Sequence, residues 1–360
     1  MALAAPLLQP AAPPSPPIVP TLVARPRRGA WSPSEWGFAL YFAWMTSLAV
    51  LMRDGIFLRQ WGWLNGAALL YLGTLLALRG EPARRAAGWA GQVTRQLTAL
   101  LVLLGLAYGQ AGTFRDRLAP SIENWLIRSD LRWFGIDWVH RFPPGPGPVT
   151  DLLQSIYLVN YGLLLLGVLL AANLQGRALR IQRRPNRLAF LQGVSAALFF
   201  GLLLCYVTFP FLPAITPRLY FAQLRLASDG TAQAINWTLL AHFSTPSGIL
   251  PSGHVAGPTA LGCAFWAQRY RGWGVFFMVS AALIAVATVY GDYHFVLDTW
   301  AGAAAGFTGW AVAHAAVQYR FRSPAATLTA APGRGPARLR DQRSPGRVGS
   351  IWNASLKRLK

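Results

Sequence analysis

The chain has 360 residues, of which 54% are hydrophobic and only 12% are charged, a composition that a water-soluble domain of this size rarely shows. Its 33 Lys and Arg residues against 12 Asp and Glu residues give a formal net charge of +21. Because the arginines lie between apolar runs instead of forming one stripe, this charge indicates basic loops facing anionic lipid and not a nucleic-acid surface. The composition therefore predicts an integral membrane protein.

Apolar runs long enough to cross a hydrocarbon core, which takes about 20 helical residues, predict about eight transmembrane helices. These runs are 36–52, 61–78, 97–114, 152–174, 188–212, 254–268, 273–290 and 293–319, the first and sixth being short. The two ends of the chain are biased in composition instead. Residues 1–30 are Pro-rich and residues 320–360 are rich in Arg, Pro and Ser, so we expect two disordered tails.

Clusters of arginine set the expected orientation, because cytoplasmic loops keep basic residues. The clusters fall in 25–28, 79–95, 177–187 and 269–271. With eight spans they all lie on one side, together with the C-terminal tail, so we expect both termini in the cytoplasm. The abundance of Arg, Ala, Gly and Pro indicates a GC-rich, bacterial source, and the expected location is the inner (cytoplasmic) membrane with loops 113–151 and 210–253 on the outer face.

One outer segment, 121–142, interleaves Trp125, Trp133, Phe134 and Trp138 with charged residues. Aromatic and charged residues alternating in this way are typical of a helix that lies in the membrane interface. We expect an interfacial role for this segment, the alternative being contact with substrate.

The tetrapeptide Pro251-Ser252-Gly253-His254 stands on the expected outer face, where the sixth apolar run begins. A helix N-terminus offers unpaired backbone N–H groups and the positive end of the helix dipole, and a preceding Ser-Gly lets an anion approach the backbone closely. The pattern favours a phosphate site. The alternative is an ordinary Ser-Gly helix cap followed by a chance histidine.

His294 and Asp298 lie four residues apart at the start of the eighth run, so we expect them to be neighbours on one face of a helix. Asp298 is the only carboxylate set well within a predicted span, where acids are costly enough to be functional by default. A carboxylate beside an imidazole fixes its tautomer and stabilises the charge that develops on it. The pair is predicted to be a nucleophile and its orienting group; the alternative is that Asp298 only bonds a neighbouring helix.

Arg218 follows the prolines of "FPFLPAITPRLYF" in residues 209–221, also on the expected outer face. Prolines stiffen the chain, and a guanidinium is suited to phosphate oxygens, so Arg218 is a candidate phosphate ligand. The alternative is an arginine that snorkels to the interface.

The other three histidines carry less information. His140 in the amphipathic outer segment and His314 toward the inner end of the last run are expected to be structural. His242 lies in the loop before the Ser-Gly-His turn and is the remaining candidate for contact with a headgroup.

The pair "PSGH" and "HFVLD", separated by about forty residues and one apolar run, resembles the second and third signature motifs of the type 2 phosphatidic acid phosphatase superfamily of lipid phosphatases and phosphotransferases. The resemblance covers residues 97–319 and implies an all-α, polytopic membrane fold with a six-helix core there. Two extra N-terminal spans in residues 31–96 and the tails 1–30 and 320–360 lie outside it.

The resemblance implies a role for each matching residue. His294 would attack phosphorus to form a phosphohistidine, Asp298 would orient it, and His254 would protonate the leaving group. Ser252 and Gly253 would bind the phosphate. No metal and no cofactor is implied.

Two features depart from the common pattern of the superfamily. Thr288 stands where an arginine usually precedes the nucleophile by six residues, and the Lys-x6-Arg-Pro first motif is missing from the outer loop. Arg177 followed by Arg184-Pro185 imitates the first motif, but the expected topology places it on the cytoplasmic face, a membrane thickness from the histidines. We therefore reject it.

The motifs "FPFLPAITPR", "PSGH" and "YHFVLDTWAG", with "YLVNYGLLLLGVLL" in the fourth run, are similar to the branch that contains inositol phosphorylceramide synthases, whose last motif also lacks the arginine. In such a protein Arg218 would supply the positive charge that the absent Lys and Arg give elsewhere.

The expected function is a phosphotransferase that moves a phosphoinositol-like headgroup between membrane lipids at the outer face. Its partners would be a phospholipid substrate and a lipid hydroxyl acceptor. Spacing does not separate transfer from hydrolysis, because both share the first half-reaction, so a phosphatase for phosphatidic acid or a polyprenyl phosphate or diphosphate is the first alternative. The second is a non-catalytic transporter or scaffold, although the sequence lacks paired broken helices in matching halves. The headgroup and the oligomeric state stay open.

Overall fold

The computed structural model describes residues 32–52, 62, 66–74, 81–112, 120–135, 147–182, 188–221, 230–244 and 247–321. All of them lie in the first of the two units into which the chain divides, Met1–Arg322. The predicted tail 1–30 and nearly all of the predicted tail 320–360 lie outside the described residues.

Within the described residues the chain is helical, and the β pairing found there is a single antiparallel bridge between Ile215 and Ser247. The predicted all-α class is confirmed. The helices are α1 (Pro33–Met52), α3 (Glu81–Val102), the π-helix η1 (Leu103–Ala107), α4 (Tyr108–Gly112), α5 (Pro120–Phe134), α7 (Pro148–Gln182), α8 (Leu188–Thr208), α9 (Pro217–Tyr220), α10 (Thr231–Phe243), α11 (Gly253–Ala267), α12 (Arg271–Tyr290) and α13 (Val296–Phe321), and residues 66–74 are also helical.

Each of the eight predicted apolar runs contains helix, but fewer helices meet the requirements for crossing a membrane. Among the described residues, three stretches are long and apolar enough, and a fourth qualifies if two segments bent by 49° count as one span. The three are Gly88–Ala111, Phe190–Thr208 and Arg271–Tyr290, and the bent pair is Pro148–Asn160 with Gly162–Arg177. The chain is therefore compatible with a membrane protein, and the number of about eight spans stays a prediction.

The sixth predicted span shows why the count differs. The helix α11 has 15 residues. At 1.5 Å per residue this gives a length of about 22 Å, which is less than the roughly 30 Å of a hydrocarbon core. Its side chains from Val255 to Leu261 are all buried in the protein. An apolar run of this length is explained by packing inside the bundle as well as by contact with lipid.

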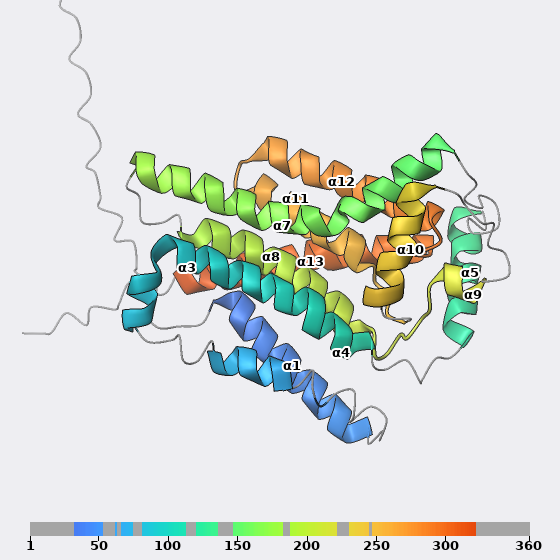
Figure 1. Cartoon of the computed structure of the whole chain (residues 1–360), viewed down its shortest axis with the longest axis horizontal. Coiled ribbons are helices and arrows are strands. Elements are labelled where there is room, and N and C mark those ends of the chain that lie inside the picture. The colour runs from blue at the N-terminus through green and yellow to red at the C-terminus, as the bar shows by residue number, and fades with distance from the viewer. Residues whose placement is uncertain are drawn as a thin grey trace, which may run out of the picture. The chain divides into compact units, whose positions relative to one another are not determined.

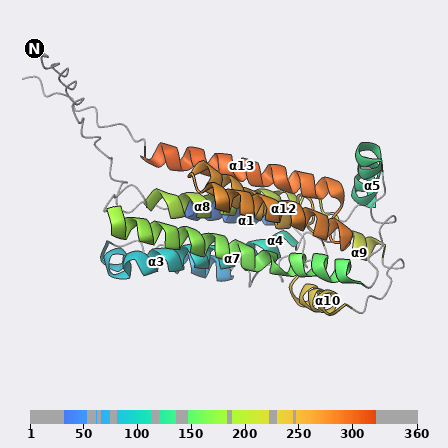
Figure 2. The ribbon, with the colours of Figure 1, turned by 90° about the horizontal axis from the view of Figure 1, so that it is seen from above.

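The core is built around α8, which contacts α1, α7, α11 and α13. In both views the axes of α7, α8, α12 and α13 lie roughly along one line of the bundle (Figure 1, Figure 2). Phe38 and Met45 of α1 belong to the same buried cluster as Leu198 and Leu202 of α8. The first predicted span therefore shares one core with helices of the predicted 97–319 domain.

Glycines allow α13 to approach α11 closely. A Cβ on Gly302 would meet the main chain of Ser252, and a Cβ on Gly306 would meet the main chain of Ala256. Small residues spaced by one helical turn let two backbones come together in this way. The contact at Gly302 fixes the turn before α11 against α13.

We expect Gly306→Ala to lower the free energy of unfolding by about 1–3 kcal/mol, because the added methyl group forces the two backbones apart. Thermal or denaturant unfolding in detergent micelles measures this loss. Gly272→Ala in α12 is the matched control, since a Cβ there meets nothing within 4 Å. A variant at Gly306 within about 0.5 kcal/mol of the unchanged protein would contradict the packing described here.

The helix α5 lies across one end of the long helices, next to α9 (Figure 1, Figure 2). It is amphipathic: Leu126 is fully buried, whereas Trp125 and Trp133 are exposed. The predicted amphipathic helix in 121–142 is thus confirmed as far as Phe134, and Trp138 lies outside the described residues.

Candidate active site

The predicted site residues come from three chain segments that meet at the end of the bundle where α5 and α9 lie. These segments are the loop 209–221, the turn 247–254 that leads into α11, and the turn 291–295 between α12 and α13. Main-chain hydrogen bonds join them. The N–H of Arg218 donates to the carbonyl of Asp292 at 2.9 Å.

Two further main-chain contacts complete this connection. The N–H of Ser252 donates to the carbonyl of Asp298 at 3.0 Å, and the N–H of Gly248 donates to the carbonyl of Ala214 at 3.1 Å. Each of the three segments is therefore bonded to another, and the backbone holds the site together before any side chain is considered.

The start of α11 agrees with the sequence prediction. Ser252 is the N-cap residue and Gly253 is the first residue of the helix. The Ser252 side chain is fully buried, yet its hydroxyl oxygen has no hydrogen-bond partner among the described residues and does not cap the helix. A buried hydroxyl without a partner is costly, so this oxygen is suited to bonding a ligand.

The two histidines of the predicted site contact each other. Nδ1 of His254 lies 3.2 Å from Nε2 of His294, although forty residues separate them in the chain. At this distance the two rings share one hydrogen bond, so one nitrogen donates a proton and the other accepts it. A proton donor and a ring nitrogen able to act as a nucleophile thus face each other.

Asp298 lies beside His294, as expected, at the ring nitrogen that does not face His254. The two residues do not share a helix face, however. Oδ2 of Asp298 lies 3.5 Å from Nδ1 of His294. The expectation of a shared helix face is wrong, because α13 begins only at Val296 and His294 lies in the preceding turn. Asp298 sits in the first turn of α13, and its carboxylate accepts a hydrogen bond from the N–H of Phe295 at 3.0 Å. This bond caps the N-terminal end of α13, which begins after His294. The same carboxylate still lies beside the imidazole.

Burial controls the charge of His294. Its side chain is almost completely buried, and it lies in the turn between α12 and α13. Burial disfavours the charged imidazolium and lowers the pKa of His294 to about 3. The ring is therefore neutral near pH 7, which is the state in which a ring nitrogen can attack phosphorus.

Both histidines, His254 and His294, line a cavity of about 410 Å³. Thr216, Arg218 and Asn236 line the same cavity. Most of the remaining lining is apolar and comes from α3, η1, α7, α8 and α10, with Leu101, Leu104, Leu158, Leu164, Leu202 and Leu239. A mainly apolar cavity with a few polar groups suits an amphipathic molecule such as a lipid with a polar headgroup.

Two tyrosines of the site were not among the predicted residues. The ring of Tyr157 in α7 lies between His254 and Tyr293, with centroid distances of 4.9 Å and 4.1 Å. The guanidinium of Arg218 lies 5.9 Å from the centre of the Tyr293 ring. Stacked rings thus connect the arginine to His254 and restrict the orientation of both.

A buried amide network supports these rings from α7 and α10. Oε1 of Gln154 accepts hydrogen bonds from the hydroxyl of Tyr293 at 2.6 Å and from Nδ2 of Asn236 at 2.8 Å. Nothing in the sequence marks Gln154 or Asn236, because polar residues in apolar helices occur often and their partners lie far away in the chain.

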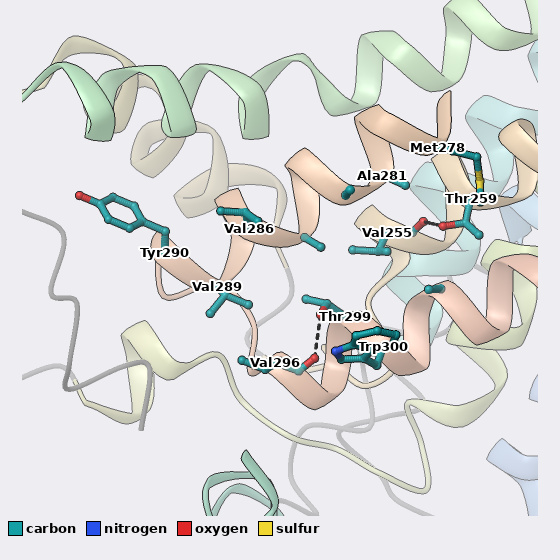
Figure 3. Close-up of a pocket in the computed structure, with 13 residues that line it drawn as sticks. Val255, Thr259, Met278, Ala281, Val286, Val289, Tyr290, Val296, Thr299 and Trp300 are labelled. Atoms are coloured by element: carbon teal, nitrogen blue, oxygen red, sulfur yellow. Dashed lines mark hydrogen bonds between the residues drawn. The ribbon is translucent and has the colours of Figure 1, made fainter. Parts of the chain in front are cut away.

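A second cavity, of about 600 Å³, lies between α11, α12 and α13 (Figure 3). The hydroxyls of its two threonines are used within their own helices: Thr259 donates to the carbonyl of Val255 at 2.8 Å, and Thr299 donates to the carbonyl of Val296 at 2.7 Å (Figure 3). The hydroxyl of Tyr290 lies 2.8 Å from that of Thr150 in α7. None of the predicted site residues is among the described residues that line it. The groove offers an apolar surface but no reactive group.

The remaining histidines lie apart from the site. His242 is an exposed residue of α10 whose Nδ1 lies 2.7 Å from the carbonyl of Thr238, and it does not line the 410 Å³ cavity. His314 lies in α13 beside Trp310. His140 is outside the described residues.

No family model, no curated protein and no solved structure matches the chain.

Proposed function

We propose that the protein is a membrane lipid phosphotransferase that works through a phosphohistidine on His294. The observation that carries this proposal is the row of groups His254, His294 and Asp298, with contacts of 3.2 Å and 3.5 Å, whose two histidines line a mainly apolar cavity. Nucleophilic phosphoryl transfer requires a proton donor, a neutral nucleophile and a carboxylate that orients the nucleophile. These three residues are of the types that can supply them.

We further propose that residues 97–319 form a six-helix catalytic core, with two additional spans before it and about eight spans in all. The direction of the helices supports an outer site. The helix α11 starts at the site and α12 returns to it, so the turn between them, with Arg269 and Arg271, lies at the opposite end. Basic turns favour the cytoplasmic side, which leaves the site on the outer face.

In the first half-reaction, the phosphate of the substrate lies against Arg218, the Ser252 hydroxyl and the N–H of Gly253. Nε2 of His294 attacks phosphorus and forms an N–P bond while the bond from phosphorus to the lipid oxygen breaks. His254, which acts in its imidazolium form beside the negative phosphate, gives its extra N–H proton to that departing oxygen and becomes neutral. Asp298 stabilises the positive charge that develops on the imidazole of His294.

In the second half-reaction, His254 accepts the proton of an incoming hydroxyl, whose oxygen attacks the phosphohistidine and breaks the N–P bond. A lipid hydroxyl gives transfer, and water gives hydrolysis. The apolar wall of the cavity supports a lipid acceptor, because it can hold a hydrocarbon chain beside the histidines. By the sequence resemblance, the transferred group is a phosphoinositol-like headgroup.

The second candidate is a phosphatase for phosphatidic acid or for a polyprenyl phosphate or diphosphate, which would use the same residues with water as acceptor. A non-catalytic transporter or scaffold is the third candidate. The contact between His254 and His294 favours either enzyme over it, because a buried histidine facing a half-buried one gives no advantage in packing alone.

The test uses purified full-length protein in detergent with phosphorus-labelled phospholipids, with and without a ceramide or diacylglycerol acceptor. Labelled headgroup on the acceptor supports the phosphotransferase. Free phosphate released from a phosphomonoester lipid, with no transfer to the acceptor, would contradict the phosphotransferase and support the phosphatase. No turnover of either kind would overturn both enzymatic proposals.

A further inference from the structure

The inner face of α5 carries two acids and a leucine that are almost completely buried. Glu123, Leu126 and Asp130 are 2%, 0% and 4% exposed. Their spacing of three and four residues places them on one side of the helix. Carboxylates are rarely buried unless they are bonded, so the partners of these two acids indicate what the helix does.

Asp130 bonds the start of α13. Its Oδ2 accepts a hydrogen bond from the N–H of Val296 at 2.8 Å, and its Oδ1 accepts one from the N–H of Leu297 at 2.9 Å. The first N–H groups of a helix have no partner within the helix, and a carboxylate is a strong acceptor for them. A residue 166 positions earlier in the chain therefore caps the helix that carries Asp298.

Glu123 bonds the segment that carries Arg218. Its Oε1 accepts a hydrogen bond from the N–H of Ile215 at 2.9 Å. Beside it, Oδ1 of Asn124 accepts a hydrogen bond from the hydroxyl of Tyr220 at 3.2 Å. The loop on both sides of Arg218 is thus attached to α5.

Leu126 lies between the two acids in the helix and shares one buried cluster with residues of all three segments of the site. It forms a buried apolar cluster with Ala214 of the first segment, Ile249 and Leu250 of the second, and Phe295 of the third. Phe295 directly follows His294. One helical face therefore holds the arginine loop, the Ser-Gly-His turn and the turn of the proposed nucleophile.

We propose that α5 is the positioning element of the active site, and that Asp130 and Glu123 are positioning residues that set the distances among Arg218, His254 and His294. The positioning role for the reaction rests on the proposed function. Neither acid is among the described residues that line the 410 Å³ cavity, so both act through the segments they bond.

The physical consequence is largest for Asp298. Its carboxylate contacts Nδ1 of His294 only while the first turn of α13 is held in place. Loss of the Asp130 carboxylate leaves two N–H groups of that turn without their acceptors and lets it move. A displacement of about 1 Å at a reacting group can lower a rate by about 10²-fold.

The experiment compares Asp130→Ala and Asp130→Glu with the unchanged full-length protein in detergent or lipid nanodiscs. Hydrogen exchange of the amides of Val296 and Leu297 reports the bonds directly, and kcat and KM are measured with the substrate that the unchanged protein turns over. Asp151→Ala is the matched control, because Asp151 is an exposed acid in the first turn of α7.

Asp130→Ala is expected to exchange these two amides at least about tenfold faster and to lower kcat by about 10- to 100-fold, with KM changed by less than about threefold. Asp130→Glu keeps the carboxylate and is expected to recover part of both. Asp151→Ala is expected to behave as the unchanged protein does.

Unchanged exchange at these amides in Asp130→Ala overturns the proposal, and so does faster exchange with kcat unaltered. If the unchanged protein has no activity, the proposed function fails and the exchange measurement alone decides whether Asp130 holds α13. If Asp130→Ala does not fold, Glu123→Ala is used with the amide of Ile215 as its reporter, because alanine removes the acceptor of that N–H, and the same outcomes decide.

Discussion

Replacement of His294 by alanine is expected to lower turnover of the phospholipid substrate by at least about 10³-fold and to abolish the covalent phosphoprotein. The reason is chemical: the variant has no nitrogen at the position that faces His254, so the N–P bond cannot form. Labelled substrate is mixed with protein and quenched in base, which preserves phosphohistidine, and the label that stays with the protein is counted.

The matched control for this prediction is His314→Ala. His314 is a histidine of α13 that contacts Trp310 and is not among the described residues that line the 410 Å³ cavity. It should keep turnover within about twofold of the unchanged protein. Label retained by the His294→Ala protein would show that another residue is the nucleophile, and equal losses in the two variants would indicate damage to the fold.

Replacement of His254 by glutamine is expected to lower turnover of a lipid substrate by about 10²- to 10⁴-fold, the usual contribution of a general acid. Glutamine can still bond the phosphate but cannot supply a proton at neutral pH. A substrate with a much better leaving group, such as an aryl phosphate, needs little protonation. Its turnover should therefore fall much less in the same variant.

The comparison of the two substrates separates proton donation from phosphate binding. If His254 only bound phosphate, both substrates would lose the same factor, and the proposed role as acid would be wrong. His242→Gln is the matched control, because His242 is an exposed histidine outside the cavity and its loss should affect neither substrate.

The structure also changes the interpretation of the amphipathic segment 121–142. The exposed tryptophans of α5 agree with the predicted place in the membrane interface, but its buried acids bond the segments that carry Arg218 and Asp298. A helix predicted to lie at the membrane surface is thus bonded directly to the segments of the proposed active site. The sequence pattern indicated only the exposed half of this arrangement.

The amino-acid sequence by itself determined the features that depend on neighbouring residues. Apolar runs gave helix in all eight predicted places, because a long apolar run is helical whether it faces lipid or other helices. The Ser-Gly pair predicted the start of α11 to within one residue, because Ser and Gly are both favoured at the position where a helix begins. The spacing of His294 and Asp298 predicted their contact, although not the turn that makes it.

Only the tertiary structure decided which distant residues meet. The contact of His254 with His294 depends on how α11 and α13 pack, and the bonds of Glu123 and Asp130 join residues 92 and 166 positions apart. A sequence period describes one element and carries no information on the partner of a buried acid or amide. The choice among such partners is made by the packing of the whole bundle, because every buried polar group must find an acceptor or donor there.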